Sequence, residues 1–318
     1  MKVMAYTRDG PPGVLQLREV AKPAPKSREV LIGIRATTVP QAAGGSHRGG
    51  PGHSALVVPG QELAGDVAAA GRGVTKFKAG DQVIAWSGLR LGAYAEYVCL
   101  PERGTVFPKP AAMTYEEAAT LPTSGLDATY LLRKASIQHG EKTLFNGAGG
   151  SMGTYAVQIA KAMGAEVTAV DSAAKLDMLR SIGADHVVDY TADDVLETAE
   201  TYDVIFDVIG DRPLADVLAR LSPGGRYVTA VPRMPQALGW KWTARSHGKR
   251  VIIWVPRTAG RQAQDFAFLE RLVEEGSVRA VIDRSFPLER AAEAQQYAAQ
   301  GHKKGHVVLT VDTATGSS

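Results

Sequence analysis

The clearest pattern in the chain is Leu144-Phe145-Asn146-Gly147-Ala148-Gly149-Gly150-Ser151-Met152-Gly153. It follows a predicted strand at Lys142–Asn146 and opens a predicted helix at about 152–163. Glycines here allow a tight turn and let backbone N–H groups approach a pyrophosphate, while the helix N-terminus faces the negative charge. Any tight turn between a strand and a helix needs glycine, but Asp171 also ends the next predicted strand, as a dinucleotide site requires. Together these features predict a dinucleotide-binding site formed by residues 147–153.

Strands and helices alternate around this turn, which predicts a parallel sheet wrapped by helices. The further strands are expected at 166–170, 185–188, 204–208, 226–230 and 251–254. The helices are expected at 115–121, 126–135, 174–182, 213–221 and 264–275, and a closing strand at 306–311.

The first hundred residues show a different sequence pattern, in which short predicted strands are separated by glycine and proline. Strands are expected at 30–36, 62–69, 81–86 and 92–100, which suggests a partly open barrel or sandwich. The segment 44–60 is rich in Gly, Ser and His and is expected to be a long loop.

Length and composition indicate an ordinary soluble protein of two domains. The chain has 318 residues, 45% hydrophobic and 22% charged, with a net charge of +3. The hydrophobic content excludes a disordered chain. The small net charge does not by itself indicate a nucleic-acid or membrane-surface protein. Cys99 is the single cysteine, so we expect no disulfide within the chain and a reducing, cytoplasmic setting. We see no apolar run that would serve as a secretory signal or a membrane span.

The residues around the adenosine ribose leave the choice of dinucleotide open. The Asp171 carboxylate would accept hydrogen bonds from ribose hydroxyls and repel a 2′-phosphate, which argues for NAD(H). Lys175 and Tyr190 could instead bind a 2′-phosphate as a cation and a hydroxyl donor, which slightly favours NADP(H). Ser172 is expected beside them. Gly210 and Val231, which follow two later strands, complete the predicted cofactor-binding set.

Further motifs stand in order along the chain: PGQELAG (59–65), GVTKFKAGDQV (73–83), GAYAEYV (92–98), LRSIGAD (179–185), DVIG (207–210), PGG (223–225) and GHVVL (305–309). On these motifs residues 1–311 resemble the medium-chain dehydrogenase/reductase superfamily, in its zinc-independent quinone oxidoreductase and enoyl reductase branch. The resemblance implies an α/β protein, with a barrel-like (GroES-like) catalytic domain and a Rossmann domain with a doubly wound parallel sheet. We place the first part of the catalytic domain at 1–118, the Rossmann domain at 119–256 and the return to the catalytic domain at 257–318. The resemblance also implies a homodimer and an active site in the cleft between the domains.

The chain lacks the residues that hold zinc in zinc-dependent relatives. Gln61 stands where they have a histidine ligand, and the segment 39–41 replaces a cysteine ligand. Glu62 alone cannot hold a zinc ion, which needs about three ligands. His47 and His53 lie in the glycine-rich loop and are expected to be solvated side chains. We therefore expect no metal.

Without a metal, the expected reaction is hydride transfer to a conjugated C=C–C=O group or a quinone, which needs only positioning and hydrogen-bond polarisation. The usual Asn and Asp of zinc-independent relatives are missing from 39–42, and Ser151 replaces a usual Gly. These departures suggest a specialised substrate, as in a biosynthetic pathway. Gln61, Arg48 and Asp127 are the predicted catalytic residues, and Asp127 could act as an acid if burial raises its pKa.

Two other functions remain open at this point. The missing Asn and Asp motivate a non-redox cyclase or isomerase on the same fold. Seven Arg or Lys and three tryptophans between Arg233 and Gln264 motivate a nucleotide-sensing or RNA-binding protein without turnover. That basic tract could also receive an anionic group of a small-molecule substrate, although a solvated face or a dimer contact explains it as simply. Overall we expect no nucleic-acid or membrane partner.

Overall fold

The computed structural model describes residues 1–6, 14–40, 56–197, 199–230, 245, 248–257 and 259–312. The chain divides into two compact units, Met1–Thr123 with Ala280–Ser318, and Ser124–Arg279. Both are α/β in character and together they have the expected architecture, a GroES-like β unit and a Rossmann-type unit. Residues 257–279, which we expected in the returning segment, group with the second unit because helix α7 (Ala259–Glu274) packs against helix α2 (Leu126–Ala135).

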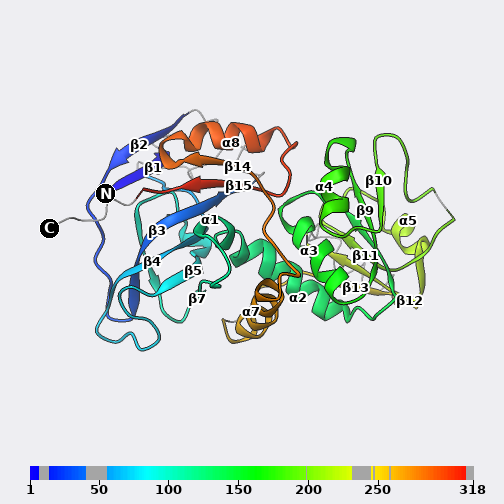
Figure 1. Cartoon of the computed structure of the whole chain (residues 1–318), viewed down its shortest axis with the longest axis horizontal. Helices are drawn as coiled ribbons and strands as arrows, with labels where there is room; N and C mark the ends of the chain where they lie inside the picture. Colours follow the sequence, from blue (N-terminus) through cyan, green and yellow to red (C-terminus); the bar gives the residue numbers. More distant parts are fainter. Residues whose placement is uncertain are drawn as a thin grey trace. The chain divides into compact units, whose positions relative to one another are not determined.

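The first unit is built on a seven-stranded sheet in the order β14-β15-β3-β4-β5-β7, with β6 also paired to β3. Its elements are β1 (Lys2–Tyr6), β2 (Leu15–Glu19), β3 (Glu29–Val39), β4 (Glu62–Ala70), β5 (Gln82–Trp86), β6 (Tyr97–Pro101), β7 (Thr105–Pro108), α1 (Tyr115–Ala118), β14 (Ile282–Pro287), α8 (Ala291–Ala299) and β15 (His306–Thr310). β15 pairs antiparallel with β3, so the end of the chain returns to the first sheet as the resemblance implied (Figure 1).

The core of this unit lies around β3, which is buried along almost its whole length. Ile32 and Ile34 of β3 pack with Leu63 of β4 and with Val307 and Leu309 of β15. Two strands that sequence patterning did not predict, β1 and β2, form a separate antiparallel pair. β2 exposes four of its five residues, so it carries little of the apolar alternation by which a strand is recognised.

The second unit is a six-stranded parallel sheet in the order β10-β9-β8-β11-β12-β13 (Figure 1). Its strands are β8 (Lys142–Asn146), β9 (Glu166–Asp171), β10 (His186–Asp189), β11 (Tyr202–Asp207), β12 (Leu221–Thr229) and β13 (Arg250–Ile253). Its helices are α2, α3 (Ser151–Ala162), α4 (Leu176–Ser181), α5 (Leu214–Ala219) and α7. From β8 the chain builds β9 and β10 on one side and β11 to β13 on the other, so the strand order reverses between β8 and β11.

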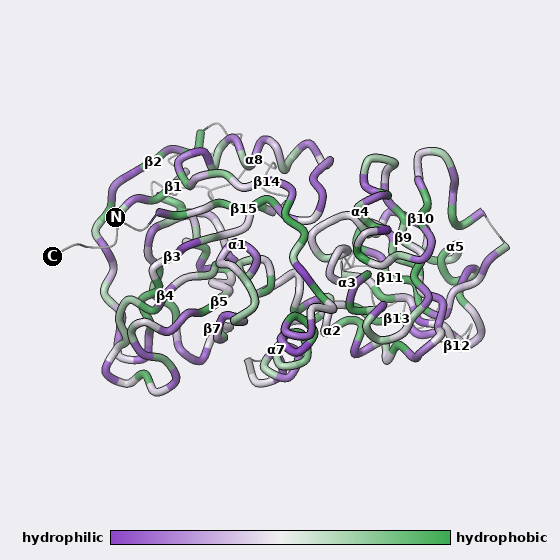
Figure 2. The backbone as a smooth tube through the Cα atoms, in the orientation of Figure 1, coloured by the Kyte–Doolittle hydropathy of each residue, from purple (hydrophilic) through white to green (hydrophobic). Residues whose placement is uncertain are grey.

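Five of the six parallel strands were predicted within two residues at either end, whereas β12 begins at Leu221, five residues before the predicted start. The central strands are mostly apolar. Phe145 of β8, Val167 of β9 and Phe206 of β11 are all buried, as expected for a sheet covered on both faces. Figure 2 shows hydrophobic stretches on these strands and many hydrophilic residues along α7. A search of the described helices finds none with the length and hydrophobicity that a membrane crossing needs.

Candidate functional site

Residues 147–150, which we call the glycine turn, lie at the carboxyl end of β8. They stand beside the point where the strand order reverses. In open α/β sheets this is where ligands bind. α3 begins at Ser151 directly after the turn, so its N-terminus carries the partial positive charge that suits a pyrophosphate. A Cβ on Gly153 would lie 2.5 Å from the carbonyl oxygens of Gly147 and Ala148. Glycine at 153 therefore lets helix and turn pack in contact, as a dinucleotide fold requires.

Asp171, at the end of β9, has its carboxylate turned into this site. Its Oδ2 accepts from the backbone N–H of Gly149 at 2.7 Å, and its Oδ1 accepts from that of Ser172 at 2.9 Å. The ammonium of Lys175 lies 3.0 Å from Oδ1, and the side chains of Lys175 and Asp171 are only 9% and 8% exposed. The structure thus brings four predicted residues into one cluster, a buried ion pair closed by two backbone donors.

Tyr190 lies beside this cluster, just past β10. Its backbone N–H donates to the carbonyl of Asp171, and the residue is 58% exposed. Tyr190 follows the carboxyl end of β10, the side of the sheet where the adenosine end of a dinucleotide would lie. The predicted adenosine-side residues therefore lie near one another, a buried ion pair and an exposed tyrosine joined through the backbone of Asp171.

On the other side of the reversal point, the turn after β11 meets the glycine turn. A Cβ on Gly147 would lie 2.7 Å from Cγ2 of Val208. The turn is shaped by Asp207, whose Oδ1 accepts from the backbone N–H groups of Ile209 at 2.9 Å and Gly210 at 3.0 Å. The predicted residue Gly210 is thereby held against the candidate site by a carboxylate that the sequence analysis had not singled out.

Asp127, a predicted catalytic residue, sits in the first turn of α2 and contacts the guanidinium of Arg257. Arg257 is itself buried, donates to Asp265 at 2.7 Å and stacks on the ring of Tyr130 with its Cζ 4.4 Å from the centroid. Burial raises the pKa of the Asp127 carboxyl, and Trp254 and Arg257 oppose that rise. The direction is the one an acid needs, but the contact with Arg257 gives Asp127 a structural role as well. Its catalytic role stays a prediction.

Gln61 and Glu62 belong to the first unit. The Gln61 side-chain amide donates to the carbonyl of Gly88 at 2.9 Å and so holds the short turn Gly88–Arg90. The buried Glu62 carboxylate contacts the hydroxyls of Thr38 and Thr123 and accepts from the backbone N–H of Thr123 at 2.9 Å. Both side chains have local partners, and the catalytic role of Gln61 also stays a prediction.

Several predicted residues lie outside the described part of the chain. These are Arg48, His47 and His53 in the glycine-rich loop, Val231 after β12, and the first part of the basic tract, residues 233–244. Within the described ranges, no group of His, Cys, Asp or Glu side chains converges in a way that could hold a metal ion.

Two family models match the chain, one described as an alcohol dehydrogenase GroES-like domain over residues 26–111 and one as a zinc-binding dehydrogenase over residues 182–309. The chain is 32% identical to the chloroplast envelope quinone oxidoreductase homolog of Arabidopsis thaliana, over 92% of each chain. The chain belongs to the medium-chain dehydrogenase/reductase superfamily, in its quinone oxidoreductase branch. It is an NAD(P)H-dependent oxidoreductase.

Two further members of the superfamily are informative. The NADPH-dependent alkenal/one oxidoreductase of Arabidopsis thaliana chloroplasts is 29% identical over 97% of this chain and 79% of that one. The solved structure of the CurF ER cyclopropanase from the curacin A biosynthetic pathway is 27% identical with a TM-score of 0.83, covering 98% of this chain and 99% of that one.

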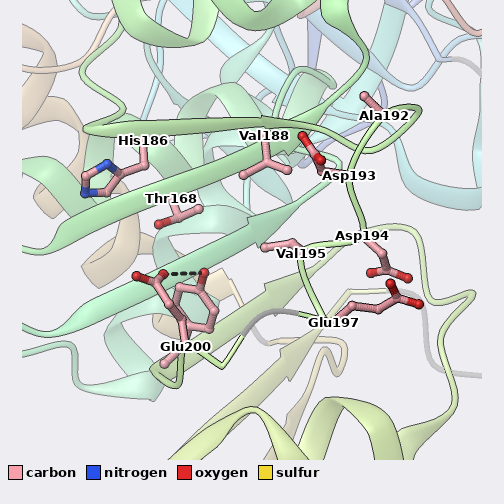
Figure 3. Close-up of a pocket in the computed structure, with 10 residues that line it drawn as sticks. Thr168, His186, Val188, Ala192, Asp193, Asp194, Val195, Glu197 and Glu200 are labelled. Carbon is pink, nitrogen blue, oxygen red and sulfur yellow. Dashed lines mark hydrogen bonds between the residues drawn. The ribbon is translucent and has the colours of Figure 1, made fainter.

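A separate cavity of about 570 Å³ opens on the second unit beside β9 and β10 (Figure 3). Its polar lining is dominated by Asp193, Asp194, Glu197 and Glu200, and Figure 3 shows Glu200 hydrogen-bonded to a neighbouring tyrosine, Tyr202. Four carboxylates would repel the phosphates of a nicotinamide dinucleotide. The cavity contains none of the predicted cofactor-binding residues, so the glycine turn remains the candidate cofactor site in this member of the superfamily.

Sequence reasoning missed the partners of the predicted residues more than the residues themselves. Asp207 stood in a quoted motif, and its place at the carboxyl end of a parallel strand was the signal that could have singled it out. Arg257 lies 130 residues from Asp127 and carries no local signal that links the two.

Proposed function

We propose that this reductase transfers hydride from a nicotinamide dinucleotide, NADPH in preference to NADH, to a quinone or an α,β-unsaturated carbonyl compound without zinc. The observation that carries the proposal is the glycine turn at the start of α3, flanked by the Asp171–Lys175 pair and by the turn of Asp207. When bound there, the cofactor supplies the hydride. The residues present fit such a group, because backbone amides and a helix N-terminus meet a cation and a hydroxyl at one sheet edge.

The preference for NADPH is supported by how Asp171 is engaged. Its carboxylate is turned toward Gly149, Ser172 and Lys175 and is nearly buried, so it is not presented to ribose hydroxyls as in an NAD-selective site. Its charge is balanced by Lys175, which reduces the repulsion of a 2′-phosphate. The exposed phenol of Tyr190 adds a donor for that phosphate.

Parallel tryptophan-fluorescence titrations with NADPH and NADH test this preference. We expect NADPH to bind more tightly, and Tyr190→Phe to weaken NADPH by about threefold while leaving NADH unchanged, because only the phosphate loses a hydrogen bond. Tighter binding of NADH would reverse the assignment.

Zinc-free chemistry is supported by the donor set near Gln61. An amide replaces a metal ligand there, and the neighbouring Glu62 carboxylate is already occupied by Thr38 and Thr123. Activity after prolonged EDTA treatment and metal analysis of the purified protein test this point. A stoichiometric zinc content together with EDTA sensitivity would contradict it.

The substrate class is supported by the chemistry that remains without a metal. A conjugated carbonyl or a quinone accepts hydride and then a proton, and needs only positioning and hydrogen-bond donors. Oxidation of NADPH in the presence of a panel of quinones, enals and enones, with saturated ketones as the control, is the direct assay. We expect turnover with the conjugated compounds and none with the saturated ketones.

The predicted catalytic residues are tested in the same assay. If Asp127 supplies the proton, Asp127→Asn should lower kcat about 100-fold and remove a kinetic pKa, whereas a purely structural role would lower thermal stability and leave the pH profile of kcat unchanged. Gln61→Ala and Arg48→Ala, assayed on quinones and enones separately, show whether either side chain polarises the carbonyl.

A second candidate function is a cyclisation in a specialised biosynthetic pathway. It is supported by the likeness to the CurF ER cyclopropanase and by the missing Asn and Asp between Val39 and Ala42. The two functions differ in stoichiometry. One NADPH oxidised for each saturated product supports simple reduction, whereas a cyclic product isolated from the substrate panel supports the second function.

We also propose a homodimer that acts on a small molecule in the cytoplasm. Among the described strands, β13 ends the six-stranded sheet with no neighbour on its outer side, which supports pairing with a second copy. The lone Cys99, which permits no disulfide within the chain, supports a reducing compartment. Light scattering after size-exclusion chromatography tests the oligomeric state, and a filter-retention assay at low salt tests the absence of RNA binding.

A further inference from the structure

Asp207 is a buried carboxylate that accepts hydrogen bonds only from neutral donors within the described part of the chain. It is 1% exposed. Its Oδ1 accepts from Asn146 Nδ2 at 3.0 Å and from the backbone N–H groups of Ile209 and Gly210, and its Oδ2 accepts from the hydroxyl of Tyr227 at 2.8 Å. Among the residues that the structure describes, no arginine, lysine or histidine forms an ion pair with it. The negative charge is therefore held in place but not cancelled.

The negative charge of Asp207 acts on the neighbouring phenol of Tyr227, which donates a hydrogen bond to it. Burial, and then the negative charge of Asp207, raise the pKa of the Tyr227 phenol, so the hydroxyl keeps its proton and points it at the carboxylate. Asn146, Asp207 and Tyr227 come from three adjacent strands, β8, β11 and β12. Side chains from three neighbouring strands thus fix the position of the Asp207 carboxylate.

The topology assigns Asp207 to one half of the bound cofactor. A dinucleotide lies across the reversal of strand order with its pyrophosphate at the glycine turn. The adenosine half runs toward β9 and β10, where Asp171, Lys175 and Tyr190 gather. The nicotinamide half must then run toward β11 and β12, past Asp207 and the turn 207–210. The contact between Gly147 and Val208 joins this turn directly to the glycine turn.

We propose that Asp207 sets the relative affinity of this site for the two redox states of the nicotinamide. This inference rests on the proposed function. The reduced ring is neutral and the oxidised ring carries one positive charge, because the departing hydride takes two electrons and one proton to the substrate carbon. A fixed negative charge on the nicotinamide side attracts the oxidised ring and has no such attraction for the reduced one. Asp207 thereby favours release of hydride to the quinone or enone.

The test is the ratio of two dissociation constants, those of NADP⁺ and NADPH, measured by titration of the full chain. Asp207→Asn preserves the size of the side chain and removes its charge. At an effective dielectric constant of about 20 and a separation of about 10 Å, we expect the ratio to rise roughly tenfold. Asp171→Asn is the matched control, because it removes another buried carboxylate from the adenosine side, where both redox states carry the same charges. It should change both constants by the same factor.

Tyr227→Phe provides a second variant that does not depend on the folding of Asp207→Asn. It leaves the carboxylate in place with one donor fewer, so the charge is less screened and the ratio should fall by about twofold. An unchanged ratio in Asp207→Asn, or a ratio that rises in Tyr227→Phe, would overturn the inference while leaving the proposed function intact. Failure of the unaltered protein to bind either nicotinamide would instead overturn the proposed function, and the inference with it.

Discussion

The two ends of the candidate cofactor site each bury one carboxylate, and they treat it in opposite ways. At the β9 end, Asp171 is paired with the ammonium of Lys175 at 3.0 Å. At the β11 end, Asp207 is surrounded by an amide, two backbone N–H groups and a phenol. The first arrangement is locally neutral, whereas the second keeps a net negative charge.

This difference suits the two halves of a nicotinamide dinucleotide. Phosphate and ribose lie at the adenosine end, where an unbalanced carboxylate would repel a 2′-phosphate. At the nicotinamide end a positive charge appears as hydride leaves, and a preorganised carboxylate can stabilise it. Burial alone therefore does not indicate what a carboxylate does. The charge of its partners decides.

The largest effect is expected at Gly153, which lies in the first turn of α3, between the two ends of the candidate cofactor site. Gly153→Ala places a Cβ 2.5 Å from two backbone oxygens, so the glycine turn must shift relative to α3. We expect both stability and cofactor affinity to fall, the affinity by about 100-fold. Gly150→Ala is the control, because its Cβ would approach the Gly147 oxygen no closer than 3.5 Å and should leave the melting temperature unchanged. Wild-type affinity in Gly153→Ala would show that the turn does not hold the cofactor.

The second-largest effect is expected at the β9 end of the site, where Lys175 neutralises Asp171. Lys175→Met removes the cation and leaves Asp171 buried with backbone donors, which should cost about 3 kcal/mol of unfolding free energy in urea. Replacing both partners, with Asp171→Asn and Lys175→Met together, should recover much of that loss. A loss below about 1 kcal/mol in the single variant would mean that Asp171 does not need its cation, and the contrast with Asp207 would disappear.

A smaller effect is expected at the unbalanced end. Tyr227→Phe removes a single hydrogen bond to a buried carboxylate and should lower the free energy of unfolding by about 2 kcal/mol. Tyr202→Phe is a suitable control, because its hydroxyl donates to the carboxylate of the exposed Glu200 rather than to a buried charge. If both variants lose the same stability, the charge of Asp207 adds nothing to its bond with Tyr227.

The smallest effect at neutral pH is expected in the other unit, at His306. Burial, with a contribution from Lys303, lowers the pKa of His306 to about 3. Between pH 6.5 and about 3 the unfolded chain therefore binds a proton that the folded chain refuses, and stability falls as the pH falls. His306→Gln removes the histidine and should therefore remove this part of the loss of stability at acid pH. Above pH 6.5 the histidine is neutral in both states, so its titration contributes nothing there. Melting curves at about pH 7.5 and about pH 5 measure this loss. An acid loss of equal size in both proteins would assign the sensitivity to the carboxylates instead.

Much of the second unit was accessible from the sequence, because its central strands are buried on both faces and its glycine turn is a local pattern. Helix α2 and strand β8 were predicted with their observed ends. The convergence of Asp171, Ser172 and Lys175 was accessible for the same reason, since five consecutive residues span them. Helix α4 begins at Leu176, two residues later than predicted, because Ala173–Lys175 forms a tighter turn that points Lys175 back at Asp171.

The local order of strands, the glycine turn and the chemistry of the adenosine side follow from residues close together in the chain, where patterning and spacing act directly. The side-chain partners of Asp207 and Asp127 do not follow from local spacing. Asp207 meets Asn146 and Tyr227 across 61 and 20 residues, and Asp127 meets Arg257 across 130. Such partners are brought together by the pairing of strands and the packing of helices, whose driving force is the burial of apolar surface rather than any attraction between the charges. The local sequence therefore placed a cation beside Asp171, whereas only the tertiary structure decided that Asp207 has neutral partners and retains its charge.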